Sequence, residues 1–305
     1  MNIITLLNRS VAALLGRVGD WIPDDIYIKM RYRLIMGRSI DLNTPQSLNE
    51  KINWLKVYYR DPRYTMLADK ASVKQIVKNI IGDEYIIPTY GVWDSFDDIN
   101  FDELPNEFVL KSTNGGGNSG VVICRNKSSF DKHRARKILE KSMKSCDKVQ
   151  REWVYYDIKP RIIAEMLMKN DDGADIVDYK FLCFNSIPYL LFYASDRYTK
   201  GQKLKFDWYD MDLHKIPAKH KGYSNSNYRL ESFPQFEEMK MVAAKLSENI
   251  PHVRIDLYLI NNKIYFGEYT FFHNGGFVPI EPYSWDLKFG SYLKLPNKNR
   301  EDLGK

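Results

Sequence analysis

Apolar residues recur three and four positions apart in several stretches of the chain, a spacing that places them on one face of an α-helix. The helices predicted in this way cover residues 48–59, 68–81, 131–144 and 233–250. Asp61-Pro62 breaks the pattern between the first two. The polar segment 94–105 predicts a loop that contains a short acidic helix.

Shorter apolar runs bounded by turn residues predict β-strands. The strands predicted in this way cover residues 85–93, 108–111, 121–126, 161–168, 178–185, 188–196, 253–260 and 263–271. Two pairs of them form hairpins, one through the glycine-rich turn 112–120 and one through the tight turn Asn261-Asn262. Because helices and strands do not alternate regularly, the order of elements predicts an α+β fold.

The composition is that of a folded protein. Of 305 residues, 44% are hydrophobic and 28% are charged, which argues against disorder over most of the chain. Basic residues exceed acidic ones by 45 to 39, a surplus that suits an anionic ligand or a phospholipid surface. No basic block stands out, so we expect no nucleic-acid partner. Cys124, Cys146 and Cys183 are too sparse for a disulfide framework or a structural zinc site, which favours a reducing cytoplasm.

Residues 1–21 combine apolar positions at helical spacing with Arg9 and Arg17. The segment is too short and too interrupted to span a bilayer, and no small-residue cleavage site follows it. Two interpretations remain open: the helix either docks on its own protein or lies on a membrane surface, as basic amphipathic segments do. In the second case the protein would work at the inner face of the membrane.

A glycine-rich turn is the first feature that indicates chemistry. Lys111 ends a predicted strand, and Gly115, Gly116, Gly117 and Gly120 fill the turn that follows. Glycines let backbone N–H groups approach phosphate oxygens, and a lysine adds a positive charge for the same oxygens. The spacing does not fit GxxxxGK[ST], and no helix follows as it would in a dinucleotide-binding turn. A purely structural glycine hairpin remains an alternative.

The C-terminal hairpin carries charged residues among apolar ones. Asp256 and Glu268 lie on its two strands, and Arg254 points to the same side as Asp256 because side chains alternate along a strand. Carboxylates that face a sheet interior need a partner charge or a cation. Magnesium prefers hard oxygen ligands of this kind, and the arginine could bind a carboxylate or a developing oxyanion. A buried network that serves only the structure is the alternative.

Glu165 stands at the end of the predicted strand 161–168 and is followed by Met166 and Leu167. One polar contact beside apolar side chains suits a slot for a purine base. An exposed acid at a strand end is the alternative interpretation.

The order of these features resembles the ATP-grasp superfamily, and in its nucleotide half D-alanine–D-alanine ligase, in which two α+β lobes hold ATP. The resemblance implies that Lys70 and Lys111 are the two phosphate-binding lysines. It also implies that Glu165 reads the adenine amino group and that Met166 and Leu167 flank the purine.

The same resemblance extends to the C-terminal half. Asp172 stands where a ribose-binding acid is expected, and Lys180 resembles the basic residue beside the transferred phosphate. Arg254 resembles the oxyanion arginine, and Asp256 and Glu268 resemble the two magnesium carboxylates.

Four further positions complete the candidate site. The superfamily commonly has Asn two residues after the last Glu, whereas this chain has Thr270, whose oxygen can still ligate a hard cation. Asn274 could take the place of that Asn, and Arg197, which follows a predicted strand, could bind an acceptor carboxylate. His273 is the one histidine that follows the predicted strand 263–271, which carries the expected magnesium ligand Glu268. The remaining ones, His133, His214, His220 and His252, are expected to be exposed.

A closer resemblance covers nearly the whole chain. Its segments, at residues 37–70, 81–111, 159–166, 178–185 and 253–271, resemble the teichuronopeptide-biosynthesis-type (TupA-like) ATP-grasp family in the same order. That family accompanies gene sets for bacterial capsule and cell-surface polysaccharides. The resemblance implies a carboxylate–amine ligase that joins an amino acid or amine to a uronic-acid carboxylate, with ATP and Mg²⁺.

We therefore expect two α+β lobes that clasp ATP, preceded by a helical N-terminal region. The predicted divisions are 1–60 (helical region), 61–105 (start of the core), 106–164 (lid with the glycine loop) and 165–305 (catalytic part). Two functional alternatives stay open, a kinase that uses the same nucleotide site on a sugar hydroxyl and a protein that assists a glycosyltransferase.

Overall fold

A computed structural model describes residues 3–299 apart from 116–119, 145–147, 175 and 196–204. Its α-helices are α1 (Ile3–Val18), α2 (Asp24–Met36), α3 (Leu48–Tyr58), α4 (Arg63–Ala68), α5 (Ser72–Ile81), α6 (Lys132–Lys144), α7 (Phe236–Leu246) and α8 (Tyr283–Tyr292). Its strands are β1 (Thr89–Trp93), β2 (Phe108–Ser112), β3 (Val121–Cys124), β4 (Ile162–Met166), β5 (Asp178–Phe184), β6 (Ile187–Ser195), β7 (Lys205–Tyr209), β8 (Lys215–Ile216), β9 (Lys219–His220), β10 (His252–Ile260), β11 (Lys263–Thr270) and β12 (Ile280–Glu281).

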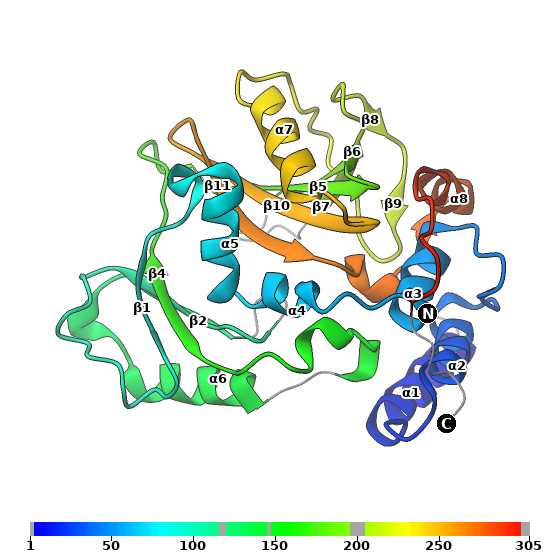
Figure 1. The fold of residues 1–305 in the computed structure, drawn as a ribbon, viewed down its shortest axis with the longest axis horizontal. Coiled ribbons are helices and arrows are strands. Elements are labelled where there is room, and N and C mark those ends of the chain that lie inside the picture. Colours follow the sequence, from blue (N-terminus) through cyan, green and yellow to red (C-terminus); the bar gives the residue numbers. More distant parts are fainter. Residues whose placement is uncertain (1–2, 116–119, 145–147, 175, 196–204, 300–305) are drawn as a thin grey trace.

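Two antiparallel sheets organise the molecule. The four-stranded sheet has the order β1-β4-β2-β3 and the six-stranded sheet the order β11-β10-β5-β6-β7-β8, while β9 and β12 form a separate short pair. Figure 1 shows α6 alongside the four-stranded sheet and α7 over the six-stranded one. The predicted boundaries at 105/106 and 164/165 both fall within the stretch 89–166 that forms the four-stranded sheet.

The four-stranded sheet has one apolar and one partly charged face, as strand periodicity requires. Phe108, Leu110, Ile162 and Ala164 point toward α6 and form a small hydrophobic core with it. The alternate positions on β2 and β4 carry Val109, Lys111, Ile163 and Glu165, which therefore share the opposite face.

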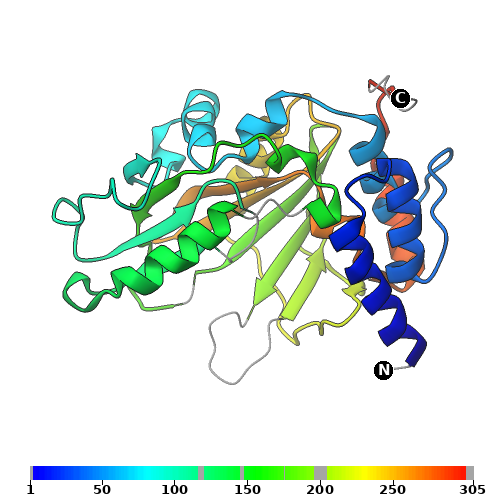
Figure 2. The same cartoon turned by 90° about the horizontal axis from the view of Figure 1, so that it is seen from below.

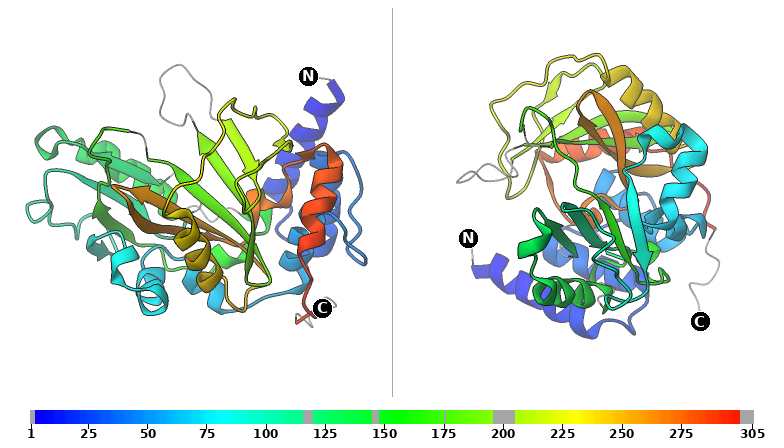
Figure 3. Two further views of the ribbon diagram at one scale, coloured as in Figure 1. Left: turned by 90° about the horizontal axis from the view of Figure 1, so that it is seen from above. Right: turned by 90° about the vertical axis from the view of Figure 1, so that its left-hand side faces the viewer.

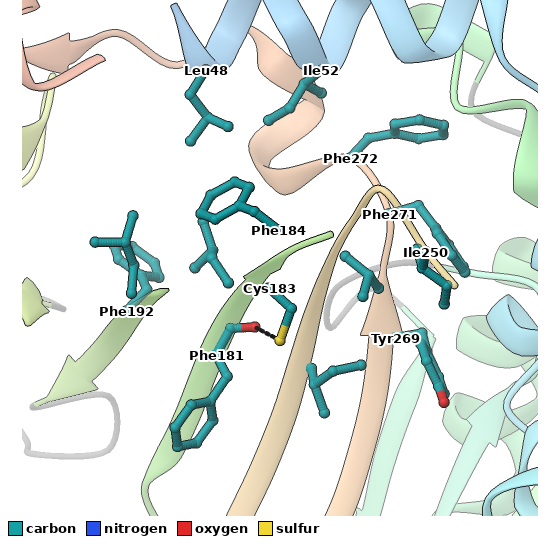
Figure 4. Packing of buried hydrophobic residues seen from close by; sticks show 14 of the residues in the cluster. Leu48, Ile52, Phe181, Cys183, Phe184, Phe192, Ile250, Tyr269, Phe271 and Phe272 are labelled. Carbon is teal, nitrogen blue, oxygen red and sulfur yellow. Dashed lines mark hydrogen bonds between the residues drawn. The ribbon is translucent and has the colours of Figure 1, made fainter. Parts of the chain in front are cut away.

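The six-stranded sheet contains the larger core, because β5 and most of β10 are buried along their length. On one face α7 packs through Phe236, Met239, Val242, Ala243 and Leu246. Figure 4 shows Leu48 and Ile52 pointing from α3 toward the sheet end at which Phe184 and Phe272 lie. The N-terminal region is thus attached to the end of the six-stranded sheet.

The N-terminal helices form a separate hairpin beside α3. Ala12 and Leu15 on α1 are buried, and the Arg31 guanidinium of α2 donates to the carbonyl of Ala12 at 3.1 Å. Figures 2 and 3 show α1 extending away from the two sheets, with its N-terminal end outermost. The predicted N-terminal helix is confirmed, and one of its sides is docked on the protein.

Three expectations from the sequence are wrong. Segment 94–105 forms turns without a helix, because the side chains of Asp98 and Asn100 accept backbone N–H groups that a helix would use. Strands β7, β8 and β9 were not expected in the stretch 205–220. His220 and His252 are not exposed: each keeps only 2% of its surface accessible.

Candidate active site

A row of charged side chains crosses three neighbouring strands of the six-stranded sheet. Asp256 on β10 lies opposite Lys180 on β5 and opposite Glu268 on β11. Arg254, two residues before Asp256, lies opposite Thr270. Because register partners and alternate residues point to the same side of a sheet, all five side chains share one face.

A β-bulge makes this row possible. The register of the hairpin steps from Leu257 opposite Phe266 to Asp256 opposite Glu268, which leaves Gly267 as the extra residue. A Cβ on Gly267 would lie 2.9 Å from the Tyr258 ring and 3.0 Å from the carbonyl oxygen of Asp256, so the bulge requires glycine. Without it, Glu268 would point to the other face of the sheet.

The charges in the row neutralise one another through short contacts. Arg254 holds Asp256 with two parallel hydrogen bonds, from Nε to Oδ1 at 2.6 Å and from Nη2 to Oδ2 at 2.7 Å. Its Nη2 also lies 3.2 Å from Glu268 Oε1. The Lys180 ammonium pairs with Asp256 and lies 3.5 Å from Asp178 Oδ2.

Burial sharpens the electrostatics of this cluster. Asp256 is 1% exposed, and burial alone would raise its pKa, but Arg254 and Lys180 hold the pKa below its ordinary value. Burial would likewise lower the pKa of Arg254, whereas Asp256 and then Glu268 raise it. The carboxylates of Asp256 and Glu268, with the Thr270 hydroxyl 3.5 Å from Glu268 Oε1, form a donor set of hard oxygens that suits Mg²⁺.

A second charged cluster lies on the four-stranded sheet. Glu165 is 5% exposed and is held by two lysines, Lys111 from β2 at 2.6 Å and Lys74 from α5 at 2.5 Å. Burial acts to raise the pKa of Glu165, but the two ammonium groups together lower it to about 2. The carboxylate is therefore ionised over the whole physiological range.

The glycine turn is attached to the segment that leads into α5. The Lys70 ammonium donates to the carbonyl of Gly115, and the Lys70 backbone N–H donates to Thr113 at 3.3 Å. A Cβ on Gly120 would come within 2.3 Å of the hydroxyls of both Ser112 and Ser142, so this position admits only glycine. The predicted phosphate contacts Gly116 and Gly117 lie outside the described residues.

The two clusters act on each other electrostatically. Burial lowers the pKa of Lys70, and the charge of Glu268 opposes that shift. Burial would also lower the pKa of Lys111, but Glu165, followed by Glu268 and Asp178, raises it above its ordinary value. Glu268 on the six-stranded sheet thus acts electrostatically on both predicted phosphate lysines.

The structure describes most of the remaining predicted positions. Met166 (39% exposed) ends β4 next to Glu165, and the half-buried Leu167 follows the strand. Asp172 is exposed, and its carboxylate accepts the N–H of Ala174 at 2.8 Å within a local turn. Arg197 lies outside the described residues.

The segment after β11 brings two more predicted residues to the site. His273 Nδ1 lies 3.4 Å from Arg254 Nη1, so the histidine touches the arginine of the charged row. Asn274 is next to it, and its side-chain amide lies 3.0 Å from the ring of His220.

Sequence reasoning missed three residues of these clusters. Lys74 stands one helical turn after Lys70, a spacing that places both on one side of the helix start. Asp178 precedes Lys180 by two residues on a strand, which puts both on the same face. These two spacings could have identified them. His220 offered no such signal, because it reaches His273 only through the pairing of β9 with β12.

Two α+β lobes with facing clusters of lysines and carboxylates define an ATP-grasp protein. Residues 50–294 match the model of the family described as TupA-like ATPgrasp, which covers most of the chain. The chain therefore belongs to the TupA-like ATP-grasp family, as its sequence segments indicated. No curated protein matches the chain.

The chain is similar to solved structures of ligases, at low identity and low TM-score. D-alanine–D-alanine ligase from Helicobacter pylori is 13% identical over 81% of this chain and 69% of its own, with a TM-score of 0.43. The Bacillus anthracis enzyme complexed with ATP is also 13% identical, over 83% and 63%, with a TM-score of 0.38. The ATP-grasp ligase PsnB with precursor, Mg and ADP is 10% identical over 87% and 66%, with a TM-score of 0.39.

The chain covers 58% of the length of D-alanine–D-alanine ligase in a second Bacillus anthracis structure.

Among the helices whose residues are described, none has the length and apolar character needed to cross a membrane.

Proposed function

We propose that the protein is an ATP- and Mg²⁺-dependent carboxylate–amine ligase that forms ADP and an amide. The observation that carries this proposal is the row Lys180, Asp256 and Glu268, completed by Arg254 and in electrostatic contact with Lys70 and Lys111. Cations and magnesium ligands on one surface suit transfer of a phosphoryl group, which depends mostly on positioning and charge stabilisation.

The proposed reaction has two steps. A carboxylate oxygen of the acceptor attacks the γ-phosphorus of ATP, and the bond from that phosphorus to the bridging oxygen breaks with release of ADP. The nitrogen of an amine then attacks the acyl carbon of the acyl phosphate. A C–N bond forms, inorganic phosphate leaves with the electron pair of the C–O bond, and the nitrogen loses a proton.

This chain's residues would divide the work between the two sheets. Lys70 and Lys111 would bind phosphate oxygens from the side of the four-stranded sheet, and Lys180 would contact the transferred phosphoryl group. Arg254 would stabilise the tetrahedral oxyanion of the second step. Magnesium, held by Asp256, Glu268 and Thr270, would offset negative charge on the phosphates.

The nucleotide end of the site is assigned in the same way. Glu165, flanked by Met166 and Leu167, would receive the adenine amino group once its two lysines turn toward phosphate. Asp172 would contact the ribose. These roles rest on the family resemblance together with the burial and pairing of Glu165.

We further propose that the acceptor is a uronic-acid carboxylate of a bacterial capsule or cell-surface polysaccharide precursor and that the amine is an amino acid or a related amine. Five segments that resemble the polysaccharide-associated family support this choice. The surplus of six positive charges suits an anionic acceptor. Arg197, His273 and Asn274 are the proposed substrate-side residues.

The test is an assay of ADP release with Mg-ATP, glucuronate or galacturonate, free or as nucleotide sugars, and a panel of amino acids. We expect ADP formation that depends on both acceptor and amine, and a product that mass spectrometry identifies as the amide. Formation of a phosphorylated sugar without any requirement for an amine would replace the ligase with the kinase alternative.

We also propose that the outer side of the N-terminal hairpin contacts an anionic membrane surface on the cytoplasmic side. Val11, Leu14 and Trp21 are 44%, 59% and 83% exposed, and α1 contains no acidic residue. The outer stripe of α2 mixes the apolar Ile26 and Met30 with the basic Lys29 and Arg33. Amphipathic helices that bind anionic lipids combine apolar and basic side chains in this way.

Co-sedimentation with phosphatidylglycerol-containing vesicles tests this contact. Binding should exceed that to phosphatidylcholine vesicles and should fall in Leu14→Ser and Trp21→Ser. The control Met241→Ser removes an equally exposed apolar side chain (65%) from α7 and should leave binding unchanged. Equal loss in all three variants, or lipid-independent dimerisation through this face in sedimentation analysis, would refute the membrane contact.

A further inference from the structure

Two buried histidines from distant parts of the chain meet behind Arg254. His273 comes three residues after the end of β11, and His220 ends β9, which pairs with β12. Both are 2% exposed, and their Nε2 atoms are 3.3 Å apart, within hydrogen-bonding distance. The Nδ1 atom of His273 faces Arg254 Nη1 at 3.4 Å. The three side chains thus form a line that ends in the charged row.

The chemistry of the donors gives this line a direction. A guanidinium has only donors, so Nδ1 of His273 must be the unprotonated acceptor and its hydrogen must be on Nε2. That N–H can donate to Nε2 of His220, which places the hydrogen of His220 on Nδ1. The Asn274 side-chain nitrogen Nδ2 lies 3.0 Å from that Nδ1 and 3.2 Å from Nε2 of His273, and both ring nitrogens carry hydrogen in this scheme. The scheme therefore requires the amide to be turned over, so that its oxygen accepts from both rings.

The surroundings favour neutral rings in this line. Phe192 packs on both imidazoles, with ring centres 4.9 Å from His220 and 5.1 Å from His273, and Trp208 lies within 5.6 Å of each. Burial lowers the pKa of His220 to about 4 and lowers that of His273 well below its usual range. Neutral imidazoles can accept the bonds that the line requires.

The line bears on how Arg254 is oriented. Its Nε and Nη2 donate to Asp256 and Glu268. Its Nη1 makes no hydrogen bond to either of these two carboxylates. His273 accepts one hydrogen of Nη1 and so adds a further contact to the guanidinium plane that Asp256 already holds. The second hydrogen of Nη1 is then held in one direction, as a preorganised donor for a developing oxyanion must be.

We propose that His273 and His220 are positioning residues that hold the Arg254 guanidinium in its reactive orientation. The inference rests on the proposed function, in which Arg254 stabilises the oxyanion. It replaces the substrate-side role of His273 with a contact to Arg254, and it adds His220, a residue that would touch neither substrate nor nucleotide. It predicts an effect on turnover rather than on ATP affinity.

Matched variants test the kinetic part. His220→Leu keeps the apolar volume but removes the acceptor, and His220→Gln returns a polar group near the position of Nε2. In the ligase assay, kcat should fall about tenfold in His220→Leu, the scale usual for loss of an outer orienting partner, with the KM for Mg-ATP unchanged. His220→Gln should recover most of kcat. Likewise, the kcat of His273→Asn, which keeps an acceptor near Nδ1, should be higher than the kcat of His273→Leu.

Equal kcat in the Leu and Gln variants, or losses that follow only the melting temperature, would overturn the positioning role. A second measurement needs no substrate and remains decisive if His220→Leu fails to fold. Long-range ¹H–¹⁵N spectra of ¹⁵N-histidine-labelled wild-type protein report the tautomer of each of the five histidines. We expect the Nε2–H form for His273 and the Nδ1–H form for His220 at pH 7.

A protonated ring at either position, or the same tautomer at both, would refute the hydrogen-bonded line. The two measurements separate the two proposals. The expected tautomers in a protein that forms no amide product would leave the line intact and count against the ligase. Amide formation together with other tautomers would support the ligase and count against the hydrogen-bonded line.

Discussion

The charged clusters of the two sheets are built in different ways. Arg254, Lys180, Asp256 and Glu268 all stand on adjacent strands of one sheet, so the backbone register fixes their mutual distances. Glu165 instead receives one lysine from its own sheet and one from helix α5. The first cluster is a rigid row, whereas the second depends on how a helix docks against a strand.

This difference suggests a division of roles. A row set by strand register suits metal and phosphoryl contacts, which require atoms held to within fractions of an ångström. A carboxylate shared by lysines from two elements can exchange partners when a nucleotide arrives. Lys70 adds to this, because it ties the glycine turn to the start of α5. The following predictions test the contrast, beginning with the largest effect.

Asp256→Asn should reduce ATP turnover at least about a hundredfold, because it removes a proposed magnesium ligand and the partner of Arg254. The change also leaves two cations in a buried site, so we expect a lower melting temperature. Breaking a buried ion pair typically costs about 3–5 kcal/mol. Steady-state ADP release and thermal unfolding measure the two effects. Asp212→Asn, an exposed position between β7 and β8, is the control, and near-normal turnover in Asp256→Asn would disprove the assigned role.

Lys111→Met should act mainly on nucleotide affinity. A charge-assisted hydrogen bond is worth about 1.5–3 kcal/mol, so the Kd for Mg-ATP should rise by about ten- to a hundredfold. Titration calorimetry measures it, with Lys144→Met, an exposed lysine at the end of α6, as the matched control. An unchanged Kd would remove Lys111 from the phosphate site and leave it as a structural partner of Glu165.

Glu165→Gln should reduce the change in the free energy of unfolding between neutral and acidic pH. The pKa of Glu165 is lowered from 4.5 to about 2, so the ionised carboxylate stabilises the fold above pH 4.5, and this contribution is lost as pH falls toward 2. The linked free energy of unfolding amounts to at most about 3 kcal/mol. Urea unfolding of wild type and variant between pH 6 and 3 measures it, and the exposed Glu231→Gln should retain the wild-type slope. Parallel slopes for wild type and Glu165→Gln would contradict the pairing.

The two clusters also differ in how much the sequence could predict. Alternation along strands places Arg254 with Asp256, and a hairpin through Asn261-Asn262 brings Glu268 near. A regular hairpin with that turn, however, would set Asp256 opposite Gly267. The bulge at Gly267, which turns Glu268 toward Asp256, depends on local packing against Tyr258 that spacing does not reveal.

Long-range partners were the least predictable. Glu165 was recognised from the apolar residues after it, but its pairing with Lys74 depends on where α5 docks. His220 was expected to be an exposed helix or loop residue, whereas it lies on the two-residue strand β9. It is buried because β9 pairs with β12, some 60 residues further along the chain. Tertiary pairing of this kind leaves no periodic pattern in the sequence.

The smallest expected effect concerns Thr270, the position at which the superfamily commonly has Asn. Its hydroxyl lies beside Glu268 and opposite Arg254, so it can serve the rigid row as a weak oxygen donor. Thr270→Val keeps the shape and removes that oxygen, and the Mg²⁺ concentration for half-maximal activity should rise about fivefold, the equivalent of a single net hydrogen bond. Thr270→Asn returns an oxygen and should need no more Mg²⁺ than wild type. If Thr270→Val kept the wild-type requirement, Asp256 and Glu268 would be the metal ligands that this row supplies, and the threonine would only fill space.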